Sequence, residues 1–441
     1  MSYVAIVLGF VILVAFCLLN IHIVIASFVA ALAVTVLARL PFTETMVTVF
    51  FTRFGMITGS LFPMFLFGAM LAKLYTNSGA ATQIANTVAN TLFRSAKTDR
   101  KKYALGFLSI IIASAILCYG GINAAVALIA IYPIAIGIFE KAGIPKRFIM
   151  GAICGGAFTF ALSGPGSPQP TNVVAMAIVS SSYCGLVAGI VGMIVEVTVM
   201  LLVFTRMCIK ATEMGERFIP GPNDVFEKED GSKPRFVITL IPILVLLIVF
   251  NVLTINISIS LLITVLVAIL CFYPQLHGKT VMKAINEGAQ GALAPTVAIS
   301  AVNGFAAVVQ SVPEYQALID GLLSSSLPPI FLLVICIAVI CMMTGGSTTG
   351  TQIALPILAP VLTKLGLTLP FIHRVGTFAA TMLDSLPNSG AVIMAVGLAD
   401  LKMKDGYPPV FISTVLATTC GTIAVALISV YCTNSKNRGS K

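Results

Sequence analysis

Charged residues and histidine are scarce in this chain of 441 residues, and tryptophan is absent. Asp, Glu, Lys and Arg make up only 10% of the residues, whereas hydrophobic residues make up 58%. Soluble domains have about a quarter of their residues charged, so this composition excludes a soluble globular protein. Because no long polar block separates the apolar runs, a separate aqueous domain is excluded too, and we expect one polytopic membrane domain.

Motifs for enzymatic or ATP-driven chemistry are also missing. The three histidines and ten cysteines show no metal-ligand spacing, and no HExxH, GxSxG or Walker sequence occurs. We therefore expect no enzyme, no resident metal or cofactor, and no direct use of ATP. The net charge of +10 lies in short loops, which is typical of membrane topology. We expect no nucleic-acid partner.

Two apolar runs are interrupted by clusters of proline, glycine and polar residues. The first interruption, "SGPGSPQPTN", begins at Ser163, and the second, "DSLPNSG", begins at Asp384. Irregular backbone at membrane depth is tolerated only where it is buried in protein or lines a cavity. Interrupted spans at matching positions in two halves are the sequence pattern that best indicates a transporter's binding site.

The two halves of the chain carry related segments in the same order. "GGINAAVALIAIYP" at Gly120 resembles "GGSTTGTQIALPILAP" at Gly345, and both precede an interrupted run. If the two Gly-Gly segments are tips of re-entrant hairpins, each half has five spans, and the second half enters the membrane inverted. We therefore predict an all-α polytopic membrane protein of two inverted-topology repeats. Each repeat has about five transmembrane helices, one re-entrant hairpin and one broken helix.

The predicted boundaries follow this plan. The first repeat covers 1–207, with scaffold 1–75 (spans at about 3–19, 22–39 and 56–75), hairpin 103–140, broken helix 147–182 and a last span 184–206; a cytoplasmic linker covers 208–235; the second repeat covers 236–433, with scaffold 236–310, hairpin 329–364, broken helix 370–399 and a last span 408–431; the tail is 434–441. Basic residues concentrate on the side of the linker, which predicts an external N-terminus. We expect a multi-pass protein of a bacterial cytoplasmic (inner) membrane.

The polar residues of the hairpin tips and breaks are the candidate ligands. A broken helix presents free N–H groups and a positive dipole end, so it can hold an anion without a buried Lys or Arg. No Lys or Arg lies centrally in a predicted span. The candidate substrate-binding residues are Gly121, Asn123, Ser163, Ser167, Gln169, Thr171, Asn172, Ser347, Thr348, Thr349, Ser385, Asn388 and Ser389. Each of them could instead only cap a helix end.

Two acidic residues lie at predicted membrane depth. A carboxylate there is costly, so it faces a cavity, pairs, or carries a proton. Asp384 stands beside the second break and is the first candidate for proton coupling, although it could instead cap a helix. Glu196 is the second candidate, with a helix-helix interface as the alternative. His373 and Arg374 are interpreted as interfacial anchors at a span entrance, with a proton relay as the alternative.

Three motifs resemble one transporter family. "FGAML" near Gly68, "SGPGSPQPTN" and "LDSLPNSGAVI" are similar to sequences of the gluconate permease (GntP) family, and the last is closest to its D-beta-hydroxybutyrate permease branch. The resemblance implies the ion-transporter superfamily, with a homodimer in which a transport domain moves like an elevator. Family members usually carry histidine at both breaks. Gln169 and Asn388 break that pattern here, which shifts a proton step toward Asp384.

The expected function is secondary active import of a small organic anion. A hydroxy-monocarboxylate such as gluconate or 3-hydroxybutyrate, moved by proton symport, fits the hydroxyl- and amide-rich breaks. A sodium-coupled carboxylate symporter stays open, since carbonyls and hydroxyls also suit Na⁺. A cation/proton antiporter is less favoured, because only one break carries an acid. The expected partners are the organic anion, the lipid bilayer and a second copy of the chain.

Overall fold

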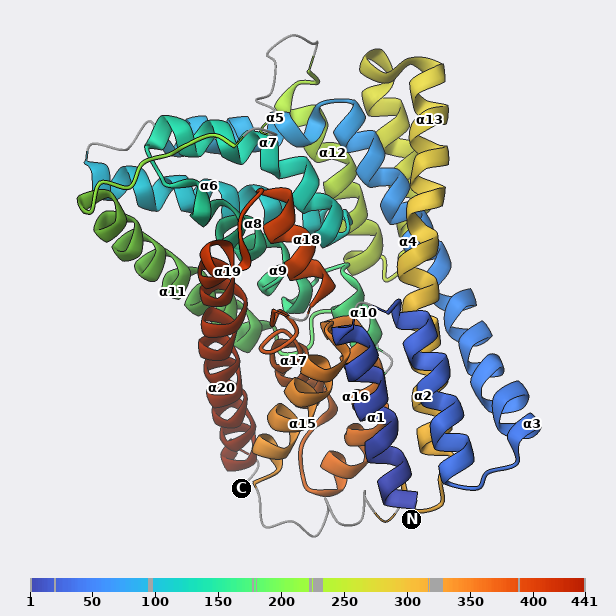
Figure 1. Ribbon diagram of the computed structural model, residues 1–441. Helices are drawn as coiled ribbons and strands as arrows, with labels where there is room; N and C mark the ends of the chain where they lie inside the picture. Colours follow the sequence, from blue (N-terminus) through green and yellow to red (C-terminus); the bar gives the residue numbers. More distant parts are fainter. Residues whose placement is uncertain are drawn as a thin grey trace.

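The computed structural model describes residues 2–439, apart from residues 20, 94–97, 177, 180, 222–223, 225–232, 316, 318–327 and 388. Every regular element in this part of the chain is a helix (Figure 1). Six helical segments of the described chain are long and apolar enough to cross a membrane, and four shorter apolar helices accompany them. The chain is therefore an all-helical membrane protein, as its composition predicts.

One group of long helices forms one side of the molecule. Its members are α1 (Ser2–Leu18), α2 (Ile23–Leu37), α3 (Phe42–Glu44), η1 (Thr45–Phe51), α4 (Thr52–Asn77), α12 (Phe236–Leu247), η3 (Ile248–Val252) and α13 (Ile257–Gln310). α13 reverses direction at His277, where φ is 55° and ψ is 164°. α4 packs along α13, and α2 packs against both α1 and α13.

The third span begins earlier than the predicted residue 56, because helical structure starts at Phe42 and continues to Asn77. Met46 and Phe50 anchor this extension, since both are buried in a cluster with residues of α2 and α13. The Phe50 ring meets Phe28 edge-on, with ring centroids 5.6 Å apart. Tertiary packing thus stabilises helical structure in a segment that contains Glu44 and threonines.

Two helical hairpins approach the middle of the molecule. The first consists of α6 (Asp99–Tyr119) and α7 (Ala124–Ala142), and the second of α15 (Pro329–Thr344) and α16 (Ser347–Lys364). Gly121 and Gly345 allow the tight turns, because their φ angles are 84° and 64°. Asn123 begins α7, where its side-chain oxygen accepts a hydrogen bond from the backbone N–H of Ala125.

Both interrupted runs are broken helices. The first contains η2 (Lys146–Phe148), α8 (Ile149–Ala157), α9 (Phe160–Ser163) and α10 (Pro170–Ala175), followed by α11 (Leu186–Glu213); the second contains α17 (Leu369–Ala380) and α18 (Gly390–Leu398), followed by α19 (Met403–Phe411), η4 (Ile412–Leu416) and α20 (Ala417–Gly439). α5 (Ala80–Phe93) connects α4 to the first hairpin. The first run is interrupted twice, before α9 and between α9 and α10.

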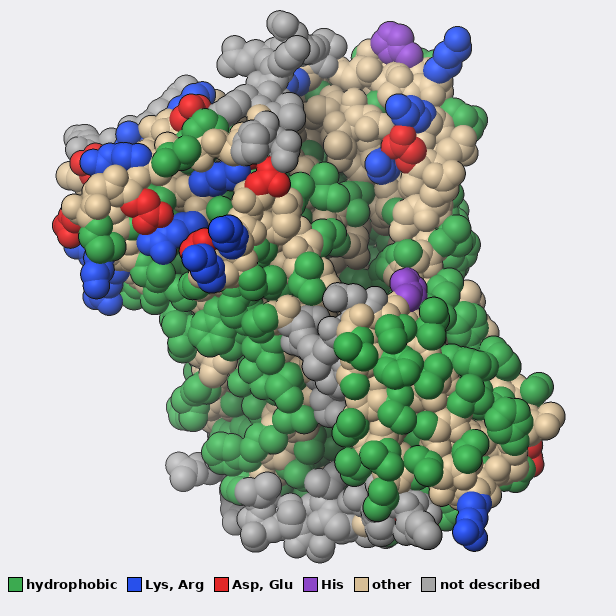
Figure 2. All heavy atoms as spheres, viewed as in Figure 1, with side chains coloured by type: hydrophobic (Ala, Val, Ile, Leu, Met, Phe, Trp, Pro, Cys, Tyr) green, Lys and Arg blue, Asp and Glu red, His purple; other side chains and the backbone are tan. Residues whose placement is uncertain are grey.

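The surface separates charged from apolar side chains. In Figure 2 the Lys, Arg, Asp and Glu side chains gather on the upper half, mostly at the upper left over the ends of α5 to α8 and α11 and in a smaller group at the upper right over α13. The lower half is largely apolar. Large apolar side chains such as Val187 on α11 and Leu427 on α20 are more than 60% exposed. An apolar exterior of this kind suits hydrocarbon rather than water.

The described part of the 208–235 segment is fastened to the first hairpin. Asp224 accepts hydrogen bonds from the Tyr132 hydroxyl at 2.8 Å and the Gly221 N–H at 2.6 Å, and its Oδ2 lies 2.9 Å from Lys146 Nζ. Burial alone would raise the pKa of Asp224, but the Lys146 ammonium and these two donors outweigh it, so the pKa lies below its ordinary value.

Replacing Asp224 with Asn should therefore lower thermal stability in detergent at pH 7. Because the pKa is depressed in the folded state, the contribution is present above the unfolded value of about 3.9 and is lost as pH falls through the folded pKa. The difference in melting temperature between wild type and Asp224→Asn should shrink below about pH 4. Glu216→Gln, which removes the more exposed pair with Arg147, is the control and should change little. A difference that stays constant down to pH 3 would contradict the assignment.

Candidate functional site

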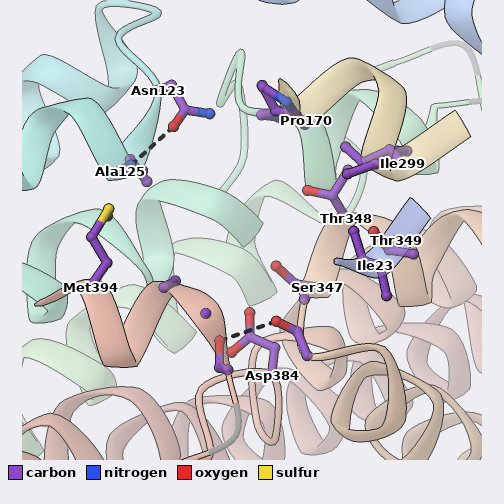
Figure 3. A pocket seen from close by; sticks show the side chains of 18 of the residues that line it. Ile23, Asn123, Ala125, Pro170, Ile299, Ser347, Thr348, Thr349, Asp384 and Met394 are labelled. Atoms are coloured by element: carbon purple, nitrogen blue, oxygen red, sulfur yellow. Dashed lines mark hydrogen bonds between the residues drawn. The ribbon is translucent and has the colours of Figure 1, made fainter. Parts of the chain in front are cut away.

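A cavity of about 890 Å³ lies between the group of long helices and the hairpin tips and breaks. One side is lined from the α1–α2 connection, α4 and α13, including His22, Phe65 and Ile299. The other side is lined from the starts of α7, α10, α16 and α18. Figure 3 shows Asn123 and Pro170 at one end of this cavity and Ser347 and Asp384 at the other. All four irregular segments therefore border one space.

The first break is bonded to both hairpin tips. Gln169 donates from Nε2 to the backbone oxygens of Cys118 and Ile122, at 2.6 and 2.9 Å, which ties it to the tip of the first hairpin. The Thr171 hydroxyl lies 3.1 Å from the hydroxyls of Ser347 and Thr348 at the start of α16. The two halves of the chain thus meet through side chains of their irregular segments.

The second break holds Asp384 beside the start of α16. Its side chain is only 5% exposed and accepts a hydrogen bond from the Ser385 hydroxyl at 2.8 Å. The hydroxyl and the backbone N–H of Ser347 lie near this carboxylate as further donors. Ser389 donates to the backbone oxygen of Gly345 at 3.1 Å, which joins the second break to the second hairpin. Asp384 is the one acidic residue among the described residues that line the cavity.

Arg374 is fully buried and braces the first break, so its interpretation as an interfacial anchor is wrong. Its Nε donates to the backbone oxygen of Cys184 at 2.7 Å, and Nη2 donates to that of Ser182 at 2.8 Å. Nη1 donates to the backbone oxygen of Ser163 and to the Asn172 side chain. No carboxylate of the described chain pairs with this guanidinium. The carbonyls of the irregular backbone take the place of a counterion.

His373 is also fully buried, and so it too is no interfacial anchor. Its Nε2 lies 3.1 Å from the Asn172 side-chain oxygen, whereas Nδ1 has no hydrogen-bond partner. Asn172 in turn donates to the backbone oxygen of Ser167 at 2.8 Å. His373 and Arg374 therefore converge on one asparagine, and through it α17 supports the first break.

Glycines at the start of α11 make room for the arginine: Gly185 directly precedes the helix, and Gly189 lies in its first turn. A Cβ at Gly185 would lie 2.7 Å from the Arg374 Cβ, and one at Gly189 would lie 2.4 Å from the Pro165 Cγ. Real Cβ atoms do not approach other carbon atoms so closely, so only glycine fits at either position. The Gly185-xxx-Gly189 spacing is thus explained by the need to seat Arg374 and the proline of the first break.

The cavity includes only part of the candidate set. Asn123, Gln169, Ser347, Thr348, Thr349, Asp384, Ser385 and Ser389 line it. Thr171 lies directly behind Ser347, whereas Ser163, Ser167 and Asn172 are bonded within the first break. Gly121 lies in the turn of the first hairpin, where a Cβ would lie 2.8 Å from the Leu246 and Leu261 side chains. Asn388 lies outside the described residues.

Glu196 lies apart from this cavity. It is fully buried on α11, and a Cβ at Gly421 of α20 would lie 2.7 Å from its Oε1. Neither carboxylate oxygen has a side-chain donor in the described chain. Its surroundings are those of a helix-helix interface, the alternative considered from the sequence, and its role in proton coupling remains a prediction.

Sequence reasoning missed the apolar side of the cavity and the brace. Phe65, Pro295 and Ile299 belong to unbroken apolar runs, so no local pattern separates them from lipid-facing residues. His22 stands at the start of α2, where its Nδ1 accepts a hydrogen bond from the Val24 N–H at 3.4 Å. The Pro and Gly residues of the breaks were the signals that sequence could supply.

Helix starts determine the electrostatics of the cavity. α7, α16 and α18 each begin at its wall, and no side chain caps α16 or α18. Their first turns present unpaired N–H groups and positive dipole ends. No Lys or Arg occurs among the described lining residues. The cavity can therefore hold an anion by backbone N–H groups and hydroxyls.

A family comparison decides what kind of protein this is. Residues 1–259, more than half of the chain, match the model of the GntP family permeases. The chain belongs to the GntP permease family. It is accordingly a multi-pass membrane transporter and not an enzyme.

Individual relatives agree with the family. The permease is 25% identical over 415 residues to YxjC, an uncharacterized transporter of Bacillus subtilis, covering 83% of this chain and 86% of the relative. It is 23% identical over 358 residues to an uncharacterized transporter of Haemophilus influenzae, covering 77% and 78%. Its fold is similar to the crystal structure of the YdaH transporter of Alcanivorax borkumensis, with a TM-score of 0.56 at 16% identity, covering 87% and 88%.

The hydrogen bonds of Arg374 to backbone carbonyls predict that Arg374→Met strongly destabilises the permease. Three backbone carbonyls would lose their donor, and each buried polar group left unsatisfied costs about 1–3 kcal/mol. Arg374→Lys should recover only part of the stability, because an ammonium cannot reproduce the planar fork of donors. The melting temperature and the folded yield in detergent are measured for both variants. Arg206→Met, at an exposed position of α11, is the matched control. An Arg374→Met protein as stable as that control would show that the brace is dispensable.

Proposed function

We propose that this permease is a secondary active transporter that imports a small organic anion by proton symport. The substrate class is a hydroxy-monocarboxylate such as gluconate or 3-hydroxybutyrate. One observation carries the proposal: three helices begin at the wall of the cavity. The described residues that line it include no Lys or Arg. The starts of α16 and α18 lack side-chain caps, so a substrate carboxylate can accept their N–H groups.

A second group in the cavity suits a hydroxyl. Gln169 is 2% exposed, and both of its amide hydrogens are directed at the carbonyls of the first hairpin tip. Its side-chain oxygen has no hydrogen-bond partner. A buried acceptor without a donor is costly, and a substrate hydroxyl would supply that donor. The Asn123 amide nitrogen, which points away from its capping bond with Ala125, offers a further donor (Figure 3).

Proton coupling follows from the position of Asp384. Its carboxylate and a substrate carboxylate would both accept hydrogen bonds at the start of α16, and two anions at one site repel each other. Protonation of Asp384 removes the repulsion and weakens the attraction between its side chain and the Ser347 donors. Substrate and proton would then bind together and leave together. A sodium ion bound by nearby carbonyls and hydroxyls is the alternative source of compensating charge.

An elevator movement between inverted halves is part of the proposal. α1 and α2 occupy the lower half of Figure 1 and α12 the upper half, which suits scaffold segments of opposite orientation. The hairpins and breaks would form the moving part, because the cavity lies between them and the scaffold. The charged upper face in Figure 2 would be cytoplasmic. Homodimerisation and the bacterial inner membrane complete the proposal by family analogy.

The test is uptake of labelled gluconate and 3-hydroxybutyrate into proteoliposomes. An imposed proton gradient should drive accumulation above equilibrium, and a protonophore should abolish it. Uptake driven only by a sodium gradient would select the sodium-coupled alternative. Uptake that responds to neither gradient would refute coupling, and failure to transport any organic anion would refute the substrate class.

Asp384→Asn should abolish gradient-driven accumulation while leaving substrate exchange measurable. The amide keeps the size and hydrogen bonding of the side chain but cannot gain or lose a proton. The accumulation ratio should fall to about one, the value expected without coupling. Asp405→Asn, at an exposed position of α19, is the matched control and should accumulate substrate like wild type. Normal accumulation by Asp384→Asn would reduce Asp384 to a helix cap.

A further inference from the structure

Apart from His22, the cavity presents its side-chain hydrogen-bonding groups on one side. The starts of α7, α10, α16 and α18 supply amides, hydroxyls and free N–H groups. The opposite side, here called the scaffold wall, consists of Ile23, Phe65, Pro295, Ala298, Ile299 and Val302. Figure 3 shows Ile23 and Ile299 together at one side of the cavity, next to Thr348 and Thr349. The polar His22 is exposed, and its ring nitrogen caps α2.

The hydroxyls that α13 carries nearby are not available to a ligand. Thr296 and Ser300 are at most 1% exposed, and each donates to a backbone oxygen of its own helix, at 2.7 and 2.8 Å. Thr58 of α4 lies 2.8 Å from the Ser300 hydroxyl. Asn303 donates to the side-chain oxygen of Gln352 at 2.6 Å. These polar side chains of α4 and α13 therefore bond to protein, and the side chains of the scaffold wall offer only carbon atoms.

We propose that the scaffold wall makes the permease selective for acids with an alkyl body over polyhydroxylated sugar acids. The proposal rests on the proposed function and narrows its substrate class. A carboxylate at the starts of α16 and α18 and one hydroxyl at Gln169 use the polar side. Carbon atoms beyond them face Ile299 and Phe65, where burial of each methylene is favourable. A hydroxyl there has no partner and should weaken binding about 10-fold.

The specificity-determining residues are thus Phe65 and Ile299, with Ile23 at the edge of the wall. They contact the substrate without bonding to its carboxylate. Their replacement should consequently change the ratio of affinities between substrates more than the capacity for gradient-driven uptake.

The proposal is tested by competition in proteoliposomes. Two unlabelled acids of equal carbon number compete with the uptake of labelled gluconate or 3-hydroxybutyrate. 3-Hydroxybutyrate carries one hydroxyl and 2,3,4-trihydroxybutyrate carries three. The half-inhibiting concentration of 3-hydroxybutyrate should be lower by at least about 10-fold, the effect of one unpaired hydroxyl. Equal or stronger competition by 2,3,4-trihydroxybutyrate would overturn the selectivity while leaving anion transport intact. If neither of the two acids nor gluconate competes, and none of the three is taken up, the proposed function itself is refuted.

Paired variants separate the effect of a hydrogen-bonding side chain from the effect of side-chain size. Ile299→Asn introduces an amide that can bond to substrate hydroxyls, and Ile299→Leu, of similar size, does not. The asparagine variant should narrow the ratio between the two acids by at least about threefold relative to the leucine variant. Ile23→Asn and Ile23→Leu repeat the comparison at a second position of the scaffold wall. Identical ratios within both pairs would overturn the role of the wall.

Discussion

The whole structure depends on satisfying irregular backbone at membrane depth. Between α9 and α10, and again between α10 and α11, the chain leaves the helical hydrogen-bond pattern, and hydrocarbon offers no replacement partners. Arg374 supplies several of them at once, since one guanidinium bonds to the carbonyls of Ser163, Ser182 and Cys184. A buried cation is costly without compensation, and here converging carbonyl dipoles provide it. The break and the arginine therefore stabilise each other, although they come from opposite halves of the chain.

This mutual support fixes the geometry of the cavity. With the backbone before α10 held by Arg374 and Asn172, Gln169 and Thr171 reach the two hairpin tips. The helix starts then border one space, and their dipoles create a positive potential without a flexible basic side chain. A backbone donor loses little conformational entropy when a ligand binds, whereas ordering a lysine is costly. Such a site can bind an anion and still release it.

Sequence reasoning found the breaks because proline, glycine and hydroxyl residues cluster there against an apolar background. It missed the burial of His373 and Arg374, since "FIHRVGTF" near the start of a span reads as an interfacial anchor. Gly185 and Gly189, which leave the space for Arg374, are far from it in the sequence, and only the fold brings them together. The early start of the helix before α4 was missed for a similar reason, because contacts with α2 and α13 override its polar residues.

The division between a polar and an apolar side of the cavity also bears on movement. If the hairpins and breaks carry the substrate past α4 and α13, every contact with the scaffold must be broken and remade. Hydrogen bonds are directional, so a ligand bonded to both sides would resist sliding. Apolar contacts are non-directional, and a wall such as Phe65 and Ile299 excludes water without fixing the ligand in one position. Donors on the side that would move and carbon on the side that would stay in place would thus combine tight, selective binding with a low barrier to transport.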